Sequence, residues 1–230
     1  MPRNKYPEET RQLILDAALA LFLEKGFEQT TVLDIVDNMG GLTRGAFYHH
    51  FKSKEEVLDS VAEQLYKVNN PFIQVRDMKG LTGLEKLKKA MLSRVGAGER
   101  EFGVGLERDE YLRLTKSMLG LLKDPRFLQG QVRDNIEASK MIEPIIAEGM
   151  ADGSIRPGNA KILSELSVLF FNFWLLPQVY PCTKEEAMDK ILVIKEIFDG
   201  LGFYLIDEEA IDAFEQFAEV LSFYPMTNVL

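Results

Sequence analysis

Histidine and cysteine are scarce in this sequence, which excludes several kinds of chemistry. A single cysteine, Cys182, provides neither an intrachain disulfide nor a set of thiolates for zinc or an iron–sulfur cluster. Both histidines, His49 and His50, are adjacent, so none remains elsewhere for a catalytic site. No nucleophile motif and no pairing of carboxylates stands out. We therefore predict no catalytic residues, no metal site and no cofactor.

Long hydrophobic runs and the alternation typical of strands are also missing. The most apolar stretch, residues 166–180, is interrupted by Asn172 and Pro177. It is shorter than the roughly 20 residues that a membrane-spanning helix needs. The N-terminus is polar and charged, unlike a signal peptide. These absences predict an all-α protein that is cytoplasmic and has no membrane partner.

Acidic residues outnumber basic ones, but unevenly along the chain. The formal net charge is −9, yet residues 1–54 hold seven basic and seven acidic residues, so the whole excess lies in residues 55–230. The basic residues in or beside the expected DNA-binding module are Arg3, Lys5, Arg11, Arg44, Lys52 and Lys54. This distribution predicts a local footprint for DNA, with an acidic body lying away from the phosphates.

A helix-turn-helix pattern occupies residues 31–51, TVLDIVDNMGGLTRGAFYHHF. Thr31 can cap a first helix, and Thr43 can cap a second helix that runs to His50. Between them, Gly40 and Gly41 can adopt the positive φ of a tight turn without steric cost. The second helix of such a motif lies in the major groove of DNA, which makes residues 43–50 the expected recognition helix.

The outward face of the second helix is small and polar. Arg44 is expected to pair with guanine, with Thr43 and His49 also reading bases and Ala46 touching a thymine methyl. Glycine inside a helix costs about 1 kcal/mol, so Gly45 indicates a close approach to DNA.

Phosphate contacts are expected on either side of this helix, from Tyr48, His50 and Lys54. Lys54 stands at the start of a further helix, where the helix dipole also favours an anion. The complete set of predicted DNA contacts is Thr31, Thr43, Arg44, Gly45, Ala46, Tyr48, His49, His50 and Lys54.

Hydrophobic spacing predicts nine or ten helices and no strand. Outside the helix-turn-helix, helices are expected at about 8–25, 53–69, 82–94, 106–122, 125–150, 160–176, 183–205 and 207–223. Pro144 predicts a kink in one of them. We expect residues 1–52 to form a three-helix DNA-binding domain and residues 53–230 an all-helical domain for effector binding and dimerisation.

The segment LTRGAFYHHFKSKEEVL, residues 42–58, resembles the recognition segment of the tetracycline-repressor (TetR) family of transcriptional regulators. The shared pattern is a hydroxyl residue, a glycine, a small residue, an aromatic pair, a histidine, a phenylalanine and Lys-x-Lys-Glu. The resemblance extends from near Thr10 to about Leu58. It departs at Val32, where many relatives carry Arg or Lys, which puts one of the family's DNA contacts in doubt.

The resemblance implies a repressor that binds a pseudo-palindromic operator as a homodimer and is released by a small hydrophobic or aromatic effector. In the family, the last two long helices form a four-helix bundle with their symmetry mates. Together with a heptad-like spacing, this predicts a dimer interface at Leu163, Leu166, Phe170, Phe173, Ile191, Ile194, Phe198, Leu201 and Leu205. The same spacing is also compatible with an intramolecular core.

An effector pocket is expected in the body because the resemblance implies one. The candidate lining residues are Tyr111, Met118, Met141, Phe170, Phe171 and Trp174, with Asn172 or Gln178 supplying polarity. Three alternatives remain open, namely an activator of the same fold, a DNA-binding dimer without an effector, and a helical enzyme.

Overall fold

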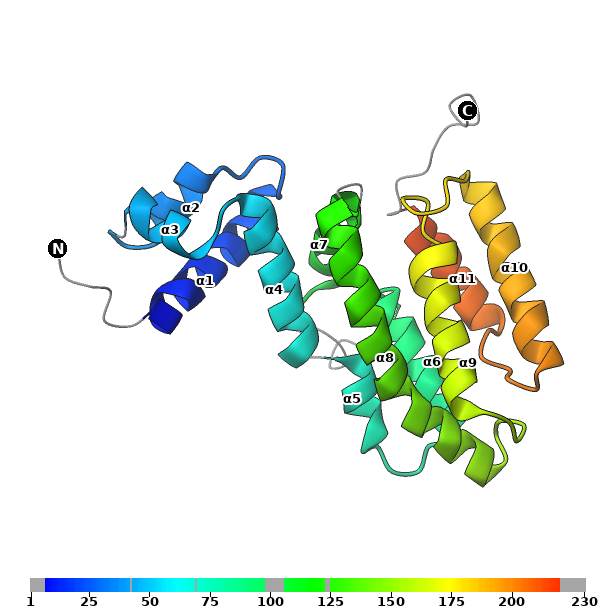
Figure 1. Ribbon diagram of the computed structural model, residues 1–230. Coiled ribbons are helices and arrows are strands. Elements are labelled where there is room, and N and C mark those ends of the chain that lie inside the picture. The colour runs from blue at the N-terminus through cyan, green and yellow to red at the C-terminus, as the bar shows by residue number, and fades with distance from the viewer. Residues whose placement is uncertain (1–6, 42, 69, 98–105, 123–124, 220–230) are drawn as a thin grey trace.

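A computed structural model describes residues 7–41, 43–68, 70–97, 106–122 and 125–219, which form helices and connecting loops without a strand (Figure 1). The predicted all-α fold is confirmed. In chain order the helices are α1 (Pro7–Lys25), α2 (Val32–Asn38), α3 (Arg44–His50), α4 (Lys54–Val68), α5 (Pro71–Arg76), α6 (Gly83–Arg94), α7 (Arg108–Leu121), α8 (Pro125–Asp152), α9 (Ala160–Leu169), a π-helical turn η1 (Phe170–Trp174), α10 (Lys184–Gly200) and α11 (Glu208–Ala218). None of the described helices combines the length and apolar character needed to cross a bilayer.

The N-terminal helices α1, α2 and α3 form a head at one end of the molecule (Figure 1). Its core gathers Ile14 from α1, Ile35 from α2 and Phe47 from α3, all fully buried. Phe51, just after α3, lies 6.2 Å from Phe47 between ring centroids and joins the same core. Both phenylalanines therefore face the interior of the head.

The core of the head continues past residue 52 into α4 and α7. Val57 and Leu58 of α4 are fully buried in it, and Leu114 and Leu121 of α7 close it from the other side. Helices α1, α4 and α7 all contact one another. The head is thus built on segments from both predicted domains, and α4 connects it to the body (Figure 1).

The body is a bundle in which α8 packs along α9 and against α6 (Figure 1). Its core includes Ile145 and Ile146 of α8, Ile194 and Phe198 of α10, and Phe203, each fully buried. Helix α8 continues through Pro144, whose side chain is exposed.

Two details of the helices differ from the prediction. Helix α5 was not expected, but Asn70 caps it by accepting a hydrogen bond from the Phe72 amide, and Pro71 occupies the first turn. Helix α10 ends at Gly200 rather than near residue 205, because Gly202 takes a φ of +69°. Leu205 therefore belongs to the segment that leads into α11.

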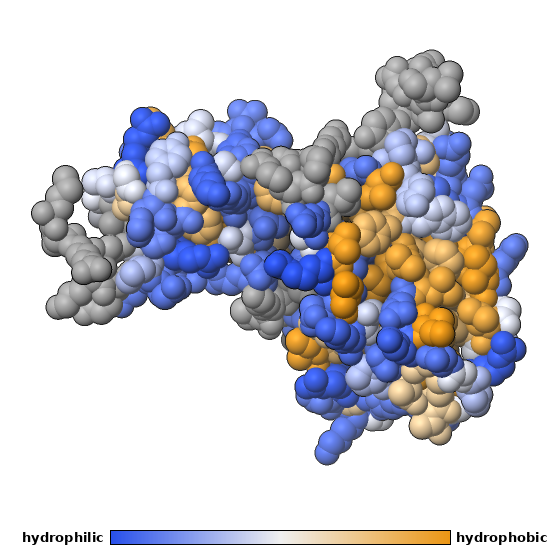
Figure 2. Space-filling model, viewed as in Figure 1, coloured by the Kyte–Doolittle hydropathy of each residue, from blue (hydrophilic) through white to orange (hydrophobic). Residues whose placement is uncertain are grey.

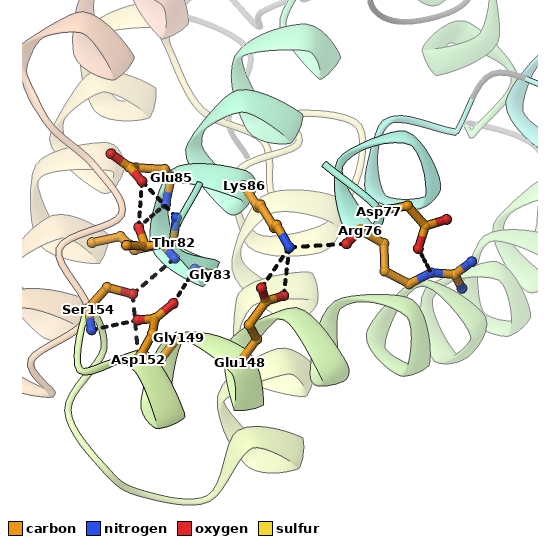
Figure 3. A network of polar contacts seen from close by, with 11 residues as sticks. Arg76, Asp77, Thr82, Gly83, Glu85, Lys86, Glu148, Gly149, Asp152 and Ser154 are labelled. Carbon is orange, nitrogen blue, oxygen red and sulfur yellow. Dashed lines mark hydrogen bonds and ion pairs between the residues drawn. The ribbon is translucent and has the colours of Figure 1, made fainter. Parts of the chain in front are cut away.

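Helices α6 and α8 cross at a glycine contact. A Cβ placed on Gly83 would lie 2.2 Å from the Gly149 nitrogen and 2.5 Å from the Ile145 carbonyl oxygen. The approach is fixed by the carboxylate of Asp152, which accepts from the Gly83 amide at 2.8 Å, as Figure 3 shows. Only glycine at position 83 lets the two backbones come this close.

An ion pair lies beside this crossing (Figure 3). Lys86 Nζ donates to Glu148 Oε1 at 2.6 Å and to the Arg76 carbonyl oxygen at 3.1 Å, which ties α6 to α8 and to the end of α5. The lysine side chain is 5% exposed, so its charge depends on these partners. The contacts at this crossing hold α5, α6 and α8 together.

Replacing Gly83 with alanine should destabilise the protein by about 1–3 kcal/mol or more, because the new methyl group overpacks against backbone atoms that cannot move alone. The matched control is Gly120→Ala in α7, where a Cβ meets no atom within 4 Å. That variant should be stabilised by about 0.5–1 kcal/mol through loss of glycine's backbone freedom. Chemical denaturation measures both, and equal effects at the two positions would contradict the close crossing.

Candidate nucleic-acid interface

The first helix of the motif is fixed by a capping box at Thr31. The Thr31 hydroxyl accepts from the Asp34 amide at 3.1 Å, and Asp34 Oδ2 accepts from the Thr31 amide at 2.7 Å. Lys25 Nζ also lies 2.8 Å from that carboxylate. The hydrogen bond from Lys25, followed by those from Thr31, holds the pKa of Asp34 well below its usual range. Thr31 is exposed but its hydroxyl already serves the cap.

The turn and the second helix form as the sequence predicts. Gly40 and Gly41 have φ values of +65° and +98°. Thr43 then caps α3, its hydroxyl accepting from the Ala46 amide at 3.3 Å. Since φ values of this sign are strained for other residues, the glycines set the angle between α2 and α3.

The outward face of α3 is open. Arg44, Gly45 and His49 are exposed, and Tyr48 is 50% exposed. Arg44 forms no ion pair with any described residue. A Cβ on Gly45 would meet only the Thr43 hydroxyl, at 3.6 Å. Packing within the chain therefore does not require glycine at position 45.

His50 has one ring nitrogen that is shielded from solvent. Its Nε2 atom is buried and has no hydrogen-bond partner among the described residues. Burial, and next the adjacent His49, lowers the pKa of His50, so the ring is neutral at pH 7. A phosphate contact from His50 would have to use the other ring nitrogen, Nδ1, and the role stays a prediction.

Lys54 also has a structural position that the sequence did not reveal. Its ammonium group donates to the carbonyl oxygens of Phe27 at 2.9 Å and Thr30 at 3.1 Å, and it lies 4.3 Å from the centroid of the Phe27 ring. Lys54 thereby fastens the start of α4 to the loop between α1 and α2. These two bonds leave the ammonium group less capacity for a phosphate, and the predicted contact stays a prediction.

Lys52 is an exposed basic residue that the set of predicted contacts left out. It stands between α3 and α4, and its amide donates to Glu56 Oε2 at 2.8 Å, while the Glu56 amide donates to the Ser53 hydroxyl at 3.4 Å. The ammonium of Lys52 takes part in none of these bonds. The sequence could have indicated a phosphate contact from Lys52, because Lys52, like Lys54, lies near the start of α4.

A cleft of about 150 Å³ separates α4 from α8 behind the interface. Asp59 and Glu63 of α4 line it opposite Asp134 of α8. Burial first, and then the charges of Asp134 and Glu63, raise the pKa of Asp59. Arg133 of α8 also lines the cleft, lies 3.5 Å from Asp134 and acts in the opposite direction on the pKa of Asp59, so the carboxylates face a cation as well as one another.

The predicted effector residues do not all come together. Phe170 and Trp174 are in contact at 5.6 Å between centroids, and Phe171 stacks on Phe214 at the same distance. Tyr111 donates to the Arg94 carbonyl oxygen at 2.7 Å. The remaining two lie elsewhere: Met141 Sδ is 3.1 Å from Asn70 Nδ2, and Met118 packs against the core of the head.

Most of the residues predicted for the dimer interface are buried or partly buried within the chain itself. Buried within the chain's own core are Leu163, Ile191, Ile194, Phe198 and Leu205. Partly buried are Leu166, Phe170 and Phe173, whereas Leu201 is 40% exposed. Heptad-like spacing marks a face that packs, and here the partner is the intramolecular core, the alternative that the sequence had left open.

A different set of apolar side chains is exposed on these helices. Figure 2 shows hydrophobic surface gathered over α9 and α10. The residues that form what we call the α9–α10 face are Ile162, Leu169, Leu192, Val193, Ile197, Leu201 and Tyr204, each between 38% and 60% exposed. Large exposed apolar patches on soluble proteins often mark interaction sites.

The helix-turn-helix region matches a protein-family model, and longer parts of the chain match known regulators. The family model described as "Bacterial regulatory proteins, tetR family" matches residues 14–61, which run from α1 into α4. The HTH-type transcriptional repressor KstR2 of Mycolicibacterium smegmatis is 35% identical over 153 residues, covering 66% of this chain and 70% of that protein. The HTH-type transcriptional regulator HbdR of Aromatoleum sp. is 30% identical over 175 residues, covering 75% and 71%.

Solved structures agree on the fold. A TetR-family transcriptional regulator from Pectobacterium atrosepticum has a TM-score of 0.59 and 21% identity, and the match covers 87% of this chain and 97% of that one. At this identity the likeness concerns the arrangement of helices alone.

Replacing Gly45 with alanine should separate folding from DNA binding. The variant should unfold at a higher temperature, because alanine favours the helix by about 1 kcal/mol and its methyl group meets open space. Affinity for DNA should nevertheless fall about tenfold, equivalent to roughly 1.4 kcal/mol, if the α3 backbone lies against the groove. Thermal unfolding and fluorescence anisotropy measure the two effects. Unchanged DNA affinity would remove Gly45 from the interface.

Proposed function

We propose that this chain, which belongs to the TetR family of bacterial regulatory proteins and is a DNA-binding transcriptional regulator, acts in the cytoplasm as a repressor that an effector releases from its operator. The observation that carries the proposal is the open outward face of α3, where Arg44 has no ion-pair partner and Gly45 has no packing role among the described residues. The name of the relative KstR2 includes the word repressor, which favours repression over activation.

Base reading falls to the exposed part of α3. Arg44 can form two hydrogen bonds with the edge of a guanine, and Ala46 can touch a thymine methyl. Tyr48 and Lys52 are exposed beside these residues and suit phosphate contacts. Lys54 supports this surface from behind by fastening the start of α4 to the loop between α1 and α2.

A homodimer would provide two such heads. Half-sites about 34 Å apart, one helical turn of DNA, are the usual arrangement for dimeric helix-turn-helix proteins, which matches a pseudo-palindromic operator. The α9–α10 face is the surface we propose for dimerisation, because it is the broad apolar area left on the helices that the family uses for this purpose.

Release would pass through α4. Its first half is packed into the core of the head together with α7, while its acidic residues face Asp134 across the cleft from α8. An effector that shifts α7 or α8 would therefore tilt α4 and change the distance between the two heads. A coupling of about 1–3 kcal/mol is typical of such linkage.

Replacing Arg44 with alanine should weaken binding to the cognate operator by about 1–3 kcal/mol and relax base preference at one position of each half-site. The matched control is Arg76→Ala on the body, an exposed arginine paired only with its neighbour Asp77. Anisotropy with labelled DNA from the gene's own upstream region, compared with random DNA, measures the effect. An Arg44 variant that binds like the control would refute the assignment of α3 as the reading helix.

Replacing Val193 with glutamate should convert the dimer to a monomer, because a charge would be buried without a partner at the centre of the α9–α10 face. Leu13→Glu is the control, a similarly exposed apolar residue in α1, far from that face in the sequence and on the head. Sedimentation analysis measures the mass of each. A Val193 variant that stays dimeric would place the interface elsewhere.

A further inference from the structure

A chain of polar side chains crosses the interior of the body. Arg94 Nη2 at the end of α6 donates to Asn172 Oδ1 in η1 at 3.3 Å. Asn172 Nδ2 donates in turn to Asn135 Oδ1 of α8 at 2.8 Å, and Gln131 Nε2 donates to the same oxygen at 3.1 Å. Asn135 and Asn172 are only 6% and 7% exposed, so these groups are shielded from water.

One donor in this network has no acceptor. Asn135 Oδ1 receives two hydrogen bonds, which fixes the orientation of the amide. The other amide atom, Asn135 Nδ2, is buried without a partner among the described residues. A buried donor left unpaired costs about 1–3 kcal/mol, so its retention needs a reason. A ligand that accepts from Asn135 supplies that reason.

The guanidinium of Arg94 also has no counter-ion among the residues that the structure describes. It forms no ion pair within the described parts of the chain, and its one hydrogen bond there goes to the neutral amide of Asn172. The dipole of α6 favours a cation at this end of the helix, which accounts for a positive charge. The dipole does not account for the direction of the side chain into the polar network, nor for the unpaired Asn135 donor.

Aromatic residues lie in the same turn as Asn172. The π-helical turn places Asn172 in the interior, and Phe170, Phe171 and Trp174 belong to the same turn. Phe170 and Phe171 pack against Phe198 of α10. The extra residue of a π-turn is often kept at functional sites. One cation and one unpaired donor, with aromatic residues in the turn that holds Asn172, match a ligand with an apolar body and an acidic group.

We propose that the effector of this regulator is a small organic acid with an alicyclic, aromatic or aliphatic body. Arg94 pairs with its carboxylate, Asn135 Nδ2 donates to an oxygen of the ligand, and the aromatic residues of η1 contact the apolar part. The proposal rests on the proposed function in one respect, that the body binds an effector.

Trp174 allows a direct test, because it is the single tryptophan of the chain and lies in η1. The probes are cyclohexylacetate, 4-cyclohexylbutanoate and decanoate, which do not absorb where tryptophan does, each compared with its primary amide. With the full-length protein, at least one acid should change Trp174 fluorescence saturably, and its amide should bind at least tenfold more weakly.

Two variants test whether the acid binds at Arg94 and Asn135. Arg94→Met keeps an unbranched side chain without the charge, and Asn135→Asp keeps the oxygen that accepts from Asn172 and Gln131 while removing the free donor. Both should lower affinity for the acid at least tenfold, with unfolding midpoints reported alongside. Lys190→Met is the control, since Lys190 Nζ also lies near the Trp174 ring, at 5.9 Å, but belongs to α10.

Three outcomes would overturn the proposal: equal binding of acid and amide, loss of acid binding in Lys190→Met alone, and no fluorescence response to any of the acids. Operator binding without any acid is measured separately by anisotropy. Retained operator binding with a failed acid test would discard the effector class and leave the regulator intact, whereas loss of operator binding in the wild-type protein would discard the regulator itself.

Discussion

The packing of α1, α4 and α7 into one hydrophobic core is the constraint on which the rest of the molecule depends. Leu58 of α4 and Leu114 of α7 are buried with Ile14 and Phe47 of the head. Removing this surface from water stabilises the head at about 25 cal/mol per Å² of apolar area. Because Phe47 of α3 is buried in the same core as Leu58 of α4, α3 is packed together with α4.

Local chemistry made part of the fold predictable. The caps at Thr31 and Thr43, with glycines between them, specify the helix-turn-helix from neighbouring residues alone, and the structure confirms each of them. The short helix α5 was missed because its signal is a single Asn-Pro cap. The regular spacing in α10 was correctly recognised as a packing face, but spacing carries no information on whether the partner is the same chain or a second copy.

Tertiary contacts decided the remaining residues. Lys54 lies next to a helix start, where phosphate binding is a sound expectation, yet carbonyl groups 24 and 27 residues earlier in the chain take up its ammonium group. Asn172 was predicted only as a source of polarity, and its links to Arg94 and Asn135 depend on three separate elements meeting in the body. Sequence patterns describe one helix at a time, so they do not predict contacts between residues of different helices.

Amide hydrogen exchange of the protein in increasing urea tests most directly whether α7 shares one core with the head. Amides in α1 around Ile14 and in α7 around Leu114 should merge into one unfolding unit with the same free energy and the same urea dependence. Amides of α7 that stay protected after α1 has exchanged would contradict this shared core, because the head would then unfold as a separate module.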